Sequence, residues 1–315
     1  MRIFMKKSTP ELSETHKLFS NSDPEEVWAR AADIVRHINP SHDFYRLRAT
    51  FDDVVRMFHG EYPGYAAIAT PYHDLSHTLS VFMCAVRLMH GVHVSGTPLS
   101  EQEMSAIMLA ALLHDVGYAQ HTGDATGTGA QFTQTHVSRG IQFMRHYAVE
   151  QDYPEGMIEC LNFLMQSTDH MKGFANIVFP DARTRMLGQI VSTADLVGQM
   201  ADRLYLEKLM LLYFEFKEAR IGNYQSIHDL LSKSFVFYEH VLHKLGNELG
   251  GVVDKLPHHF KAWLGVEHNY YAESMGKNIA YLTQVVAHGE AGFAAMLKRG
   301  SIASHVHLKL ETQYA

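Results

Sequence analysis

Two histidines four residues apart are the first candidates for chemistry. His73 and His77 belong to the segment Tyr72-His73-Asp74-Leu75-Ser76-His77. If this segment is helical, one turn separates the two imidazoles and both face the same side. Imidazole is the commonest metal ligand and a frequent acid or base, although such a pair also occurs on solvated helix faces. The pair alone therefore fits a functional site and an ordinary solvated helix face equally well.

An adjacent histidine and aspartate occur where burial is expected. His114 and Asp115 follow the apolar run 106–113, and a buried charge is costly unless it is paired or bound to a metal. Asp195 lies beside an apolar stripe in a helical pattern, although alone it could be an ordinary ion-paired residue. Combined with His77, these residues form a nitrogen and oxygen ligand set that suits a divalent ion.

These segments, in this order, resemble the HD superfamily of metal-dependent phosphohydrolases, and within it the catalytic domains of cyclic-nucleotide phosphodiesterases. That family has a Tyr-His-Asn-x-x-His motif, an Ala-x-x-His-Asp motif, an Ala-Thr-Asp motif and a late aspartate ligand. The counterparts in this chain are Tyr72 to His77, Ala111 to Asp115, Ser167-Thr168-Asp169 and Asp195. The resemblance covers about residues 70 to 200.

The resemblance implies a role for each matching residue. Asp115 would bridge two divalent ions (Mn, Fe, Mg or Zn), and His73 would be the general acid that protonates the leaving oxygen. The first ion would be held by His77, His114, Asp115 and Asp195. The surroundings of the second ion or of the substrate would include His136, Thr168 and Asp169, with His121 and His170 as further local candidates.

The chain departs from the family pattern around the second ion. Asp74 replaces the asparagine of the first motif, and Gly117-Tyr118 replaces an Asp-His pair. Thr133 stands where a glutamate is expected three residues before His136. These differences would alter the second metal's surroundings, and with them the substrate.

We therefore expect a metal-dependent phosphohydrolase in which metal-activated hydroxide attacks a phosphoester, with a cyclic-nucleotide-like phosphodiester as the first expectation. The alternatives are a nucleotide phosphomonoesterase and a non-catalytic, metal-bound regulatory or sensor module. Retention of His73 beside the whole ligand set favours an enzyme, because metal binding alone needs no acid.

Composition narrows the remaining possibilities. The 315 residues carry a formal net charge of −7 without a Lys/Arg-rich run, which disfavours binding of bulk nucleic acid. Two cysteines cannot form a disulfide framework or a cysteine-rich zinc module.

No apolar signal core or membrane-length run is found, so a cytoplasmic protein is expected. Aromatic residues in the stretch 202–299 predict core packing, with a pocket wall or a homodimer surface as the alternative.

Helical periodicity predicts an all-α fold, a single compact multi-helix domain with the metal site in a central helical cleft. The domain should span residues 23–299, between a flexible leader at 1–22 and a tail at 300–315. Asp23-Pro24 predicts the first helix start, and Ser100 with Glu103 forms a capping box. A helix should begin just after Pro71, and Gly117 should end another in the left-handed conformation. Further helices are predicted at about 134–149, 155–166, 182–200, 202–219, 225–247, 258–264, 267–287 and 290–298.

Overall fold

The computed structural model describes residues 18–123 and 125–302. Within these residues the structure is all-α, as predicted, with twelve α-helices joined by turns and short 3₁₀ segments. Most of the predicted leader (1–17) and tail (303–315) lies outside the described residues. None of the described helices is both long enough and apolar enough to cross a bilayer.

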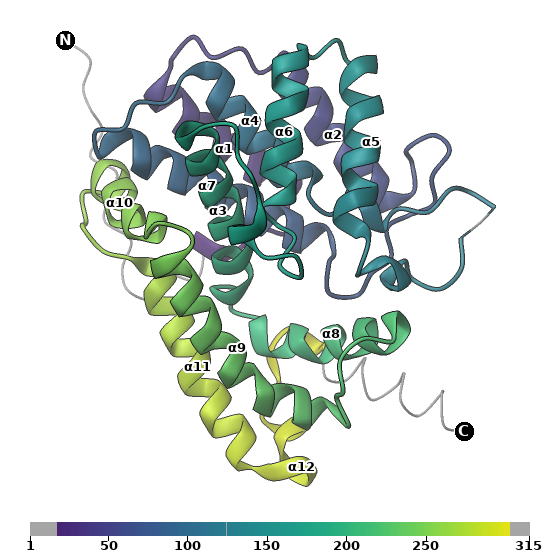
Figure 1. Ribbon diagram of the computed structural model, residues 1–315. Helices are drawn as coiled ribbons and strands as arrows, with labels where there is room; N and C mark the ends of the chain where they lie inside the picture. The colour runs from purple at the N-terminus through teal and green to yellow at the C-terminus, as the bar shows by residue number, and fades with distance from the viewer. Residues whose placement is uncertain (1–17, 124, 303–315) are drawn as a thin grey trace.

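Seven helices form the first part of the fold, and five helices follow in the C-terminal third (Figure 1). The first group consists of α1 (Pro24–Ile38), α2 (Tyr45–His59), α3 (Leu75–Val94), α4 (Glu101–Leu113), α5 (His136–Glu150), α6 (Glu155–Gln166) and α7 (Ala182–Met200). The second consists of α8 (Tyr205–Ala219), α9 (Ile227–Asn247), α10 (Leu256–Leu264), α11 (Tyr270–Ala287) and α12 (Gly289–Gly292).

Helix α3 lies at the centre of the first group. It packs against α1, α4, α7 and α10, and nearly all of its residues from His77 to Val92 are buried. Gly198 of α7 allows a close approach to α3, because an added Cβ would lie only 3.0 Å from the carbonyl oxygen of Ser80. This packing brings the metal-ligand candidates of α3 and α7 to the same place.

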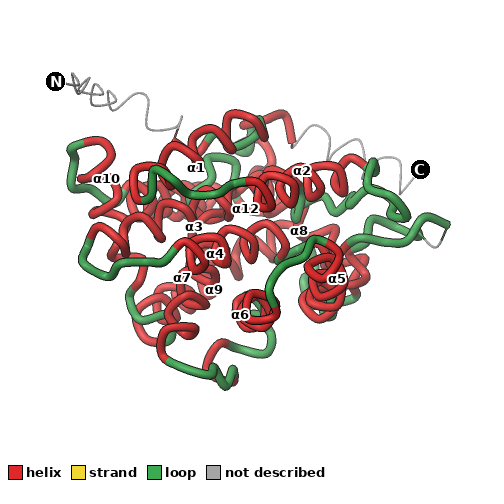
Figure 2. The backbone as a smooth tube through the Cα atoms, turned by 90° about the horizontal axis from the view of Figure 1, so that it is seen from above, coloured by secondary structure: helices red, strands yellow, loops and turns green. Residues whose placement is uncertain are grey.

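The other helices cover this centre from different directions. Figure 2 shows α5 and α6 nearly end-on, so they run across the direction of α1 and α4. Helix α6 packs against α4, α5 and α7. Helices α9 and α11 pack along each other and reach away from the first group, with α12 at their far end (Figure 1).

The predicted helix starts at Asp23 and Ser100 are confirmed. Asp23 accepts hydrogen bonds from the backbone N–H groups of Glu25 and Glu26, and Ser100 forms the complete capping box with Glu103. Each such cap contributes about 1 kcal/mol to helix stability.

The predicted start of the third helix is wrong by several residues. Asp74 is the N-cap of α3, and its side chain accepts a hydrogen bond from the backbone N–H of His77 at 2.7 Å. His73 therefore precedes the helix, and the two histidines do not share a helical turn. Their rings still lie 5.3 Å apart because the bend before Asp74 returns His73 to the helix start.

Two further local predictions are wrong. Gly117 does not adopt the left-handed conformation; it lies in a 3₁₀ turn, Val116–Tyr118. The stretch 290–298 is not one helix, because α12 ends at Gly292 and is followed by a 3₁₀ turn, Phe293–Ala295.

Candidate metal centre

Three buried side chains from two helix ends converge on one point. His77 Nε2 and His114 Nε2 lie 3.2 Å apart. Asp115 Oδ2 lies 3.2 Å from the first nitrogen and 3.1 Å from the second. His77 comes from the first turn of α3, whereas His114 is the C-cap of α4 and Asp115 follows it. The burial that the apolar run predicts for His114 and Asp115 is confirmed.

The chemistry of these atoms fits a cation. His114 Nδ1 is 3.0 Å from the carbonyl oxygen of Ala111 and donates to it, so His114 Nε2 carries a lone pair in the neutral ring. That lone pair faces Asp115 Oδ2, a buried oxygen that accepts no hydrogen bond from the described residues. Facing acceptors repel unless a proton or a metal ion lies between them. The group of His77, His114 and Asp115 could therefore hold a metal ion.

Asp195 supplies a fourth candidate ligand atom, an oxygen, near the two histidine nitrogens. Its Oδ1 atom lies 3.6 Å from His77 Nε2 and 3.8 Å from His114 Nε2. Its Oδ2 atom lies 2.9 Å from His170 Nε2. Burial favours the neutral carboxyl, but the hydrogen bond from His170 and the nearby histidines hold the pKa of Asp195 well below its usual range.

The two oxygens of Asp115 face different histidines. Oδ2 points to His77 and His114, while Oδ1 lies 3.6 Å from His136 Nε2. His136 Nδ1 lies 2.7 Å from the carbonyl oxygen of Thr133, which fixes the ring at the start of α5. Asp115 thus lies between the buried group and His136, as a bridging carboxylate would.

A buried glutamate that the sequence reasoning missed holds His73. Glu215 of α8 is 1% exposed, and its Oε2 atom lies 2.6 Å from His73 Nδ1. Its Oε1 atom accepts hydrogen bonds from the backbone N–H groups of Tyr72, at 2.6 Å, and His73, at 3.0 Å. Burial lowers the pKa of His73, but the charge and hydrogen bond of Glu215 outweigh this and raise it to about 9.

Tyr118 lies between two of the histidines. Its ring stacks on His73, with centroids 5.0 Å apart, and on His136, with centroids 4.6 Å apart. The absence of a side chain at Gly117 lets the start of α5 lie close enough for this stacking, because an added Cβ would lie 1.8 Å from the carbonyl oxygen of His136. Gly117 and Tyr118, which replace the Asp-His pair of the phosphodiesterase pattern, therefore serve to pack the histidines of this site.

The remaining predicted residues make their contacts elsewhere. Thr168 donates to the carbonyl oxygen of Met165 in its own helix end, and Asp169 binds the backbone N–H and ammonium of Lys172. His121 is exposed and its ring lies tilted against that of Tyr65, with centroids 4.5 Å apart. None of these contacts reaches the histidine and aspartate group.

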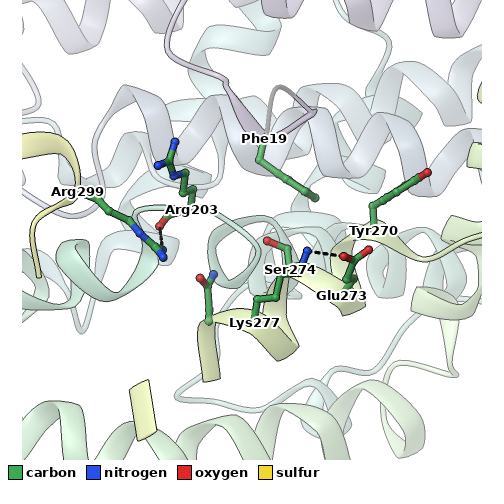
Figure 3. A pocket seen from close by; sticks show the side chains of 8 residues that line it. Phe19, Arg203, Tyr270, Glu273, Ser274, Lys277 and Arg299 are labelled. Carbon is green, nitrogen blue, oxygen red and sulfur yellow. Dashed lines mark hydrogen bonds and ion pairs between the residues drawn. The ribbon is translucent and has the colours of Figure 1, made fainter. Parts of the chain in front are cut away.

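A hollow on the C-terminal side of the fold is separate from this group. Figure 3 shows Arg299 bonded to the backbone of Arg203, and Lys277 paired with Glu273. The hollow has a volume of about 170 Å³ and is also lined by Phe19, Tyr270, Ser274 and Asn278. No predicted site residue lines it. By contrast, a space of about 10 Å³, the size of one water molecule, lies directly beside His77.

Comparison with known proteins places the chain in a family. No curated protein gives a match. One family model, described as Npun_R2479-like, matches residues 42–249. The matched range covers more than half of the chain and includes every residue of the candidate metal centre described above. The protein belongs to the Npun_R2479-like family.

Proposed function

We propose that this protein is a metal-dependent phosphohydrolase that cleaves a phosphoester, with a nucleotide phosphodiester as the preferred substrate class. The observation that carries the proposal is the His73–Glu215 pair beside the buried His77, His114 and Asp115 group. A structural metal site needs no protonated histidine next to it, whereas hydrolysis of a phosphoester needs a proton donor for the leaving oxygen.

The ligand set suits a divalent ion with mixed nitrogen and oxygen preferences. His77, His114, Asp115 and Asp195 would hold it, and Asp115 Oδ1 with His136 would face a second ion. Bound divalent ions supply a water of lowered pKa and positive charge for the phosphoryl oxygens. The two imidazoles and two carboxylates are compatible with Mn, Fe, Mg or Zn.

His73 is suited to the role of general acid. With its pKa raised to about 9, its ring is protonated at neutral pH. Glu215 engages Nδ1, which leaves the proton on Nε2 for transfer to the departing alkoxide. Donation neutralises the ring, and solvent then returns a proton to it because the glutamate continues to favour the charged form.

The differences in exposure indicate the side from which an anionic substrate would approach. The side chains of His77, His114 and Asp115 are at most 3% exposed. His73, His136 and His170 are 17%, 19% and 31% exposed. Of these six side chains, the more accessible ones are therefore imidazoles, which suit a phosphate group better than carboxylates would.

The test is metal analysis of the purified protein, followed by a phosphoester panel with the same preparation. The panel contains bis(p-nitrophenyl) phosphate, p-nitrophenyl phosphate, cyclic AMP, cyclic GMP and nucleoside monophosphates. We expect bound divalent metal and diester turnover that His73→Gln and Asp115→Asn both lose. His146→Gln, an exposed histidine of α5, is the matched control.

The outcomes separate the alternatives. Turnover of monoesters alone would identify a phosphomonoesterase. Bound metal without turnover of any ester would contradict the proposal and favour a regulatory or sensor module. Absence of metal after reconstitution with Mn²⁺ or Zn²⁺ would contradict the metal centre itself.

A further inference from the structure

A chain of contacts leads from α9 to the metal centre. Lys244 Nζ lies 3.0 Å from His170 Nδ1, and His170 Nε2 lies 2.9 Å from Asp195 Oδ2. The other oxygen of Asp195 faces His77 and His114. Lys244 is 5% exposed, so its ammonium is held within the protein and directed at the histidine.

The type of donor at His170 Nδ1 decides what Nε2 can do. A lysine ammonium has three hydrogens and no lone pair, so it can only donate. His170 Nδ1 must therefore accept, and in the neutral ring the hydrogen is then on Nε2. That hydrogen is donated to Asp195 Oδ2. A ring nitrogen that carries a hydrogen has no lone pair for a metal ion.

The surroundings of Lys244 are consistent with an ammonium. Burial holds the pKa of Lys244 below its usual value, and the carboxylates of Glu248, Asp195 and Asp169 oppose only part of this lowering. The Asp195 carboxylate is only one imidazole ring away. A cation at this position therefore has opposite charge on the far side of His170.

We propose that Lys244 is a positioning residue that makes His170 a hydrogen-bond donor to Asp195 and prevents it from acting as a metal ligand. Asp195 then presents a single oxygen, Oδ1, to the site of the first metal ion. This inference rests on the metal centre of the proposed function, but it does not depend on turnover of any ester.

The inference assigns a role to the C-terminal helices. Glu215 of α8 holds His73, and Lys244 of α9 holds His170, so two neighbouring helices fix opposite parts of the centre. Neither residue belongs to the short sequence motifs that contain the candidate metal ligands.

The experiment observes His170 directly by side-chain NMR of protein labelled with ¹⁵N-histidine, without metal and with Zn²⁺. Assignment uses His170→Gln. In the wild-type protein, we expect His170 to carry its hydrogen on Nε2 under both conditions. In Lys244→Met the tautomers should mix, and zinc affinity measured by calorimetry should fall about 10- to 100-fold.

Two comparisons make the test specific. Lys233→Met removes a half-exposed lysine from the same helix and should change neither readout. In the His170→Gln background the amide still donates to Asp195 without help from lysine, so adding Lys244→Met should cause no further loss of zinc affinity. Thermal unfolding of each variant checks that it is folded.

Zinc coordination by His170, or a hydrogen on its Nδ1 in the wild-type protein, would overturn the inference. An equal loss of affinity from Lys244→Met in both backgrounds would also overturn it. A protein with the expected tautomer and zinc affinities but without phosphoester turnover would support the inference and contradict the proposed function alone.

Discussion

Glu215 contacts His73 at both its ring and its backbone. Oε2 lies 2.6 Å from Nδ1, and Oε1 accepts the backbone N–H at 3.0 Å. The carboxylate therefore fixes the position of the ring and its protonation together. Because Glu215 is buried on α8, far from His73 in sequence, folding of the C-terminal helices is needed to complete this pair.

Glu215→Gln is predicted to move the alkaline limit of hydrolysis to lower pH. The glutamate raises the pKa of His73 to about 9, so the wild-type acid is lost only as pH rises through that value. With glutamine, the largest of the charges that oppose desolvation of the ring is lost, and the acid is lost at lower pH. The measurement is kcat against pH for both proteins. Coincident alkaline limits would contradict the assignment of His73 as the acid.

Asp115→Asn is predicted to abolish metal binding while leaving the protein folded. Asp115 Oδ2 lies 3.2 Å from His77 Nε2 and 3.1 Å from His114 Nε2. The amide of asparagine can donate to either nitrogen but cannot replace a carboxylate as a bridge. Urea unfolding in the presence of EDTA gives the free energy of unfolding, and calorimetry with Zn²⁺ gives the affinity.

Metal removal provides the control for that variant. Zinc at 100 times its dissociation constant should stabilise the wild-type protein by about 2.7 kcal/mol, and Asp115→Asn should not respond. A zinc-dependent gain in the stability of Asp115→Asn would contradict the assignment of Asp115 as a metal ligand.

Sequence periodicity predicted the fold because most helices have local signals. Asp23 and Ser100 are capping residues that act through their own neighbouring N–H groups, so their helices begin where expected. Asp74 is also a cap, but Pro71 comes three residues earlier, and a proline close to a helix start is itself a start signal. The start of α3 was therefore placed too early.

The candidate metal ligands were within reach of sequence reasoning, whereas the residues that orient them were not. His77, His114 and Asp115 belong to short motifs, and the structure brings them together. Glu215 and Lys244 are single charged residues in amphipathic helices, where a solvated face is the ordinary expectation. Their burial depends on how α8 and α9 pack, which no local pattern specifies. An acidic residue between Phe214 and Phe216 is the only local sign at Glu215.

The histidines of α1, α3 and α10 predict a loss of stability in mild acid. His90 Nε2 lies 3.0 Å from His37 Nδ1, and His90 Nδ1 lies 3.2 Å from His259 Nδ1. Burial, then the neighbouring His37 and His93, lowers the pKa of His90 to about 4, and burial also lowers the pKa of His259. The unfolded chain then binds more protons than the folded protein below about pH 6.5.

The free energy of unfolding should therefore fall as pH decreases from about 6.5 towards 4, by up to about 1.4 kcal/mol per pH unit for each such histidine. Urea unfolding at several pH values measures this slope. His90→Gln should make the slope shallower, whereas His146→Gln, which replaces an exposed histidine, should leave it unchanged. Equal slopes for wild-type protein and His90→Gln would exclude His90 as the source.

Gly117→Ala is predicted to destabilise the protein by about 1–3 kcal/mol or more and to disturb His136. The added Cβ would lie 1.8 Å from the carbonyl oxygen of His136 and 2.6 Å from the backbone nitrogen of Gly140. Backbone atoms cannot move aside as a flexible side chain can, so the first turn of α5 must shift away from Tyr118.

Gly156→Ala in α6 is the matched control, because nothing lies within 4 Å of its added Cβ. In a helix this control should be neutral or stabilising by up to about 1 kcal/mol. Thermal and urea unfolding of both variants measures their stability, and zinc affinity reports on the site. The comparison distinguishes the steric effect at Gly117 from a general intolerance of alanine. Equal stabilities of the two variants would refute the close approach of Gly117 to α5.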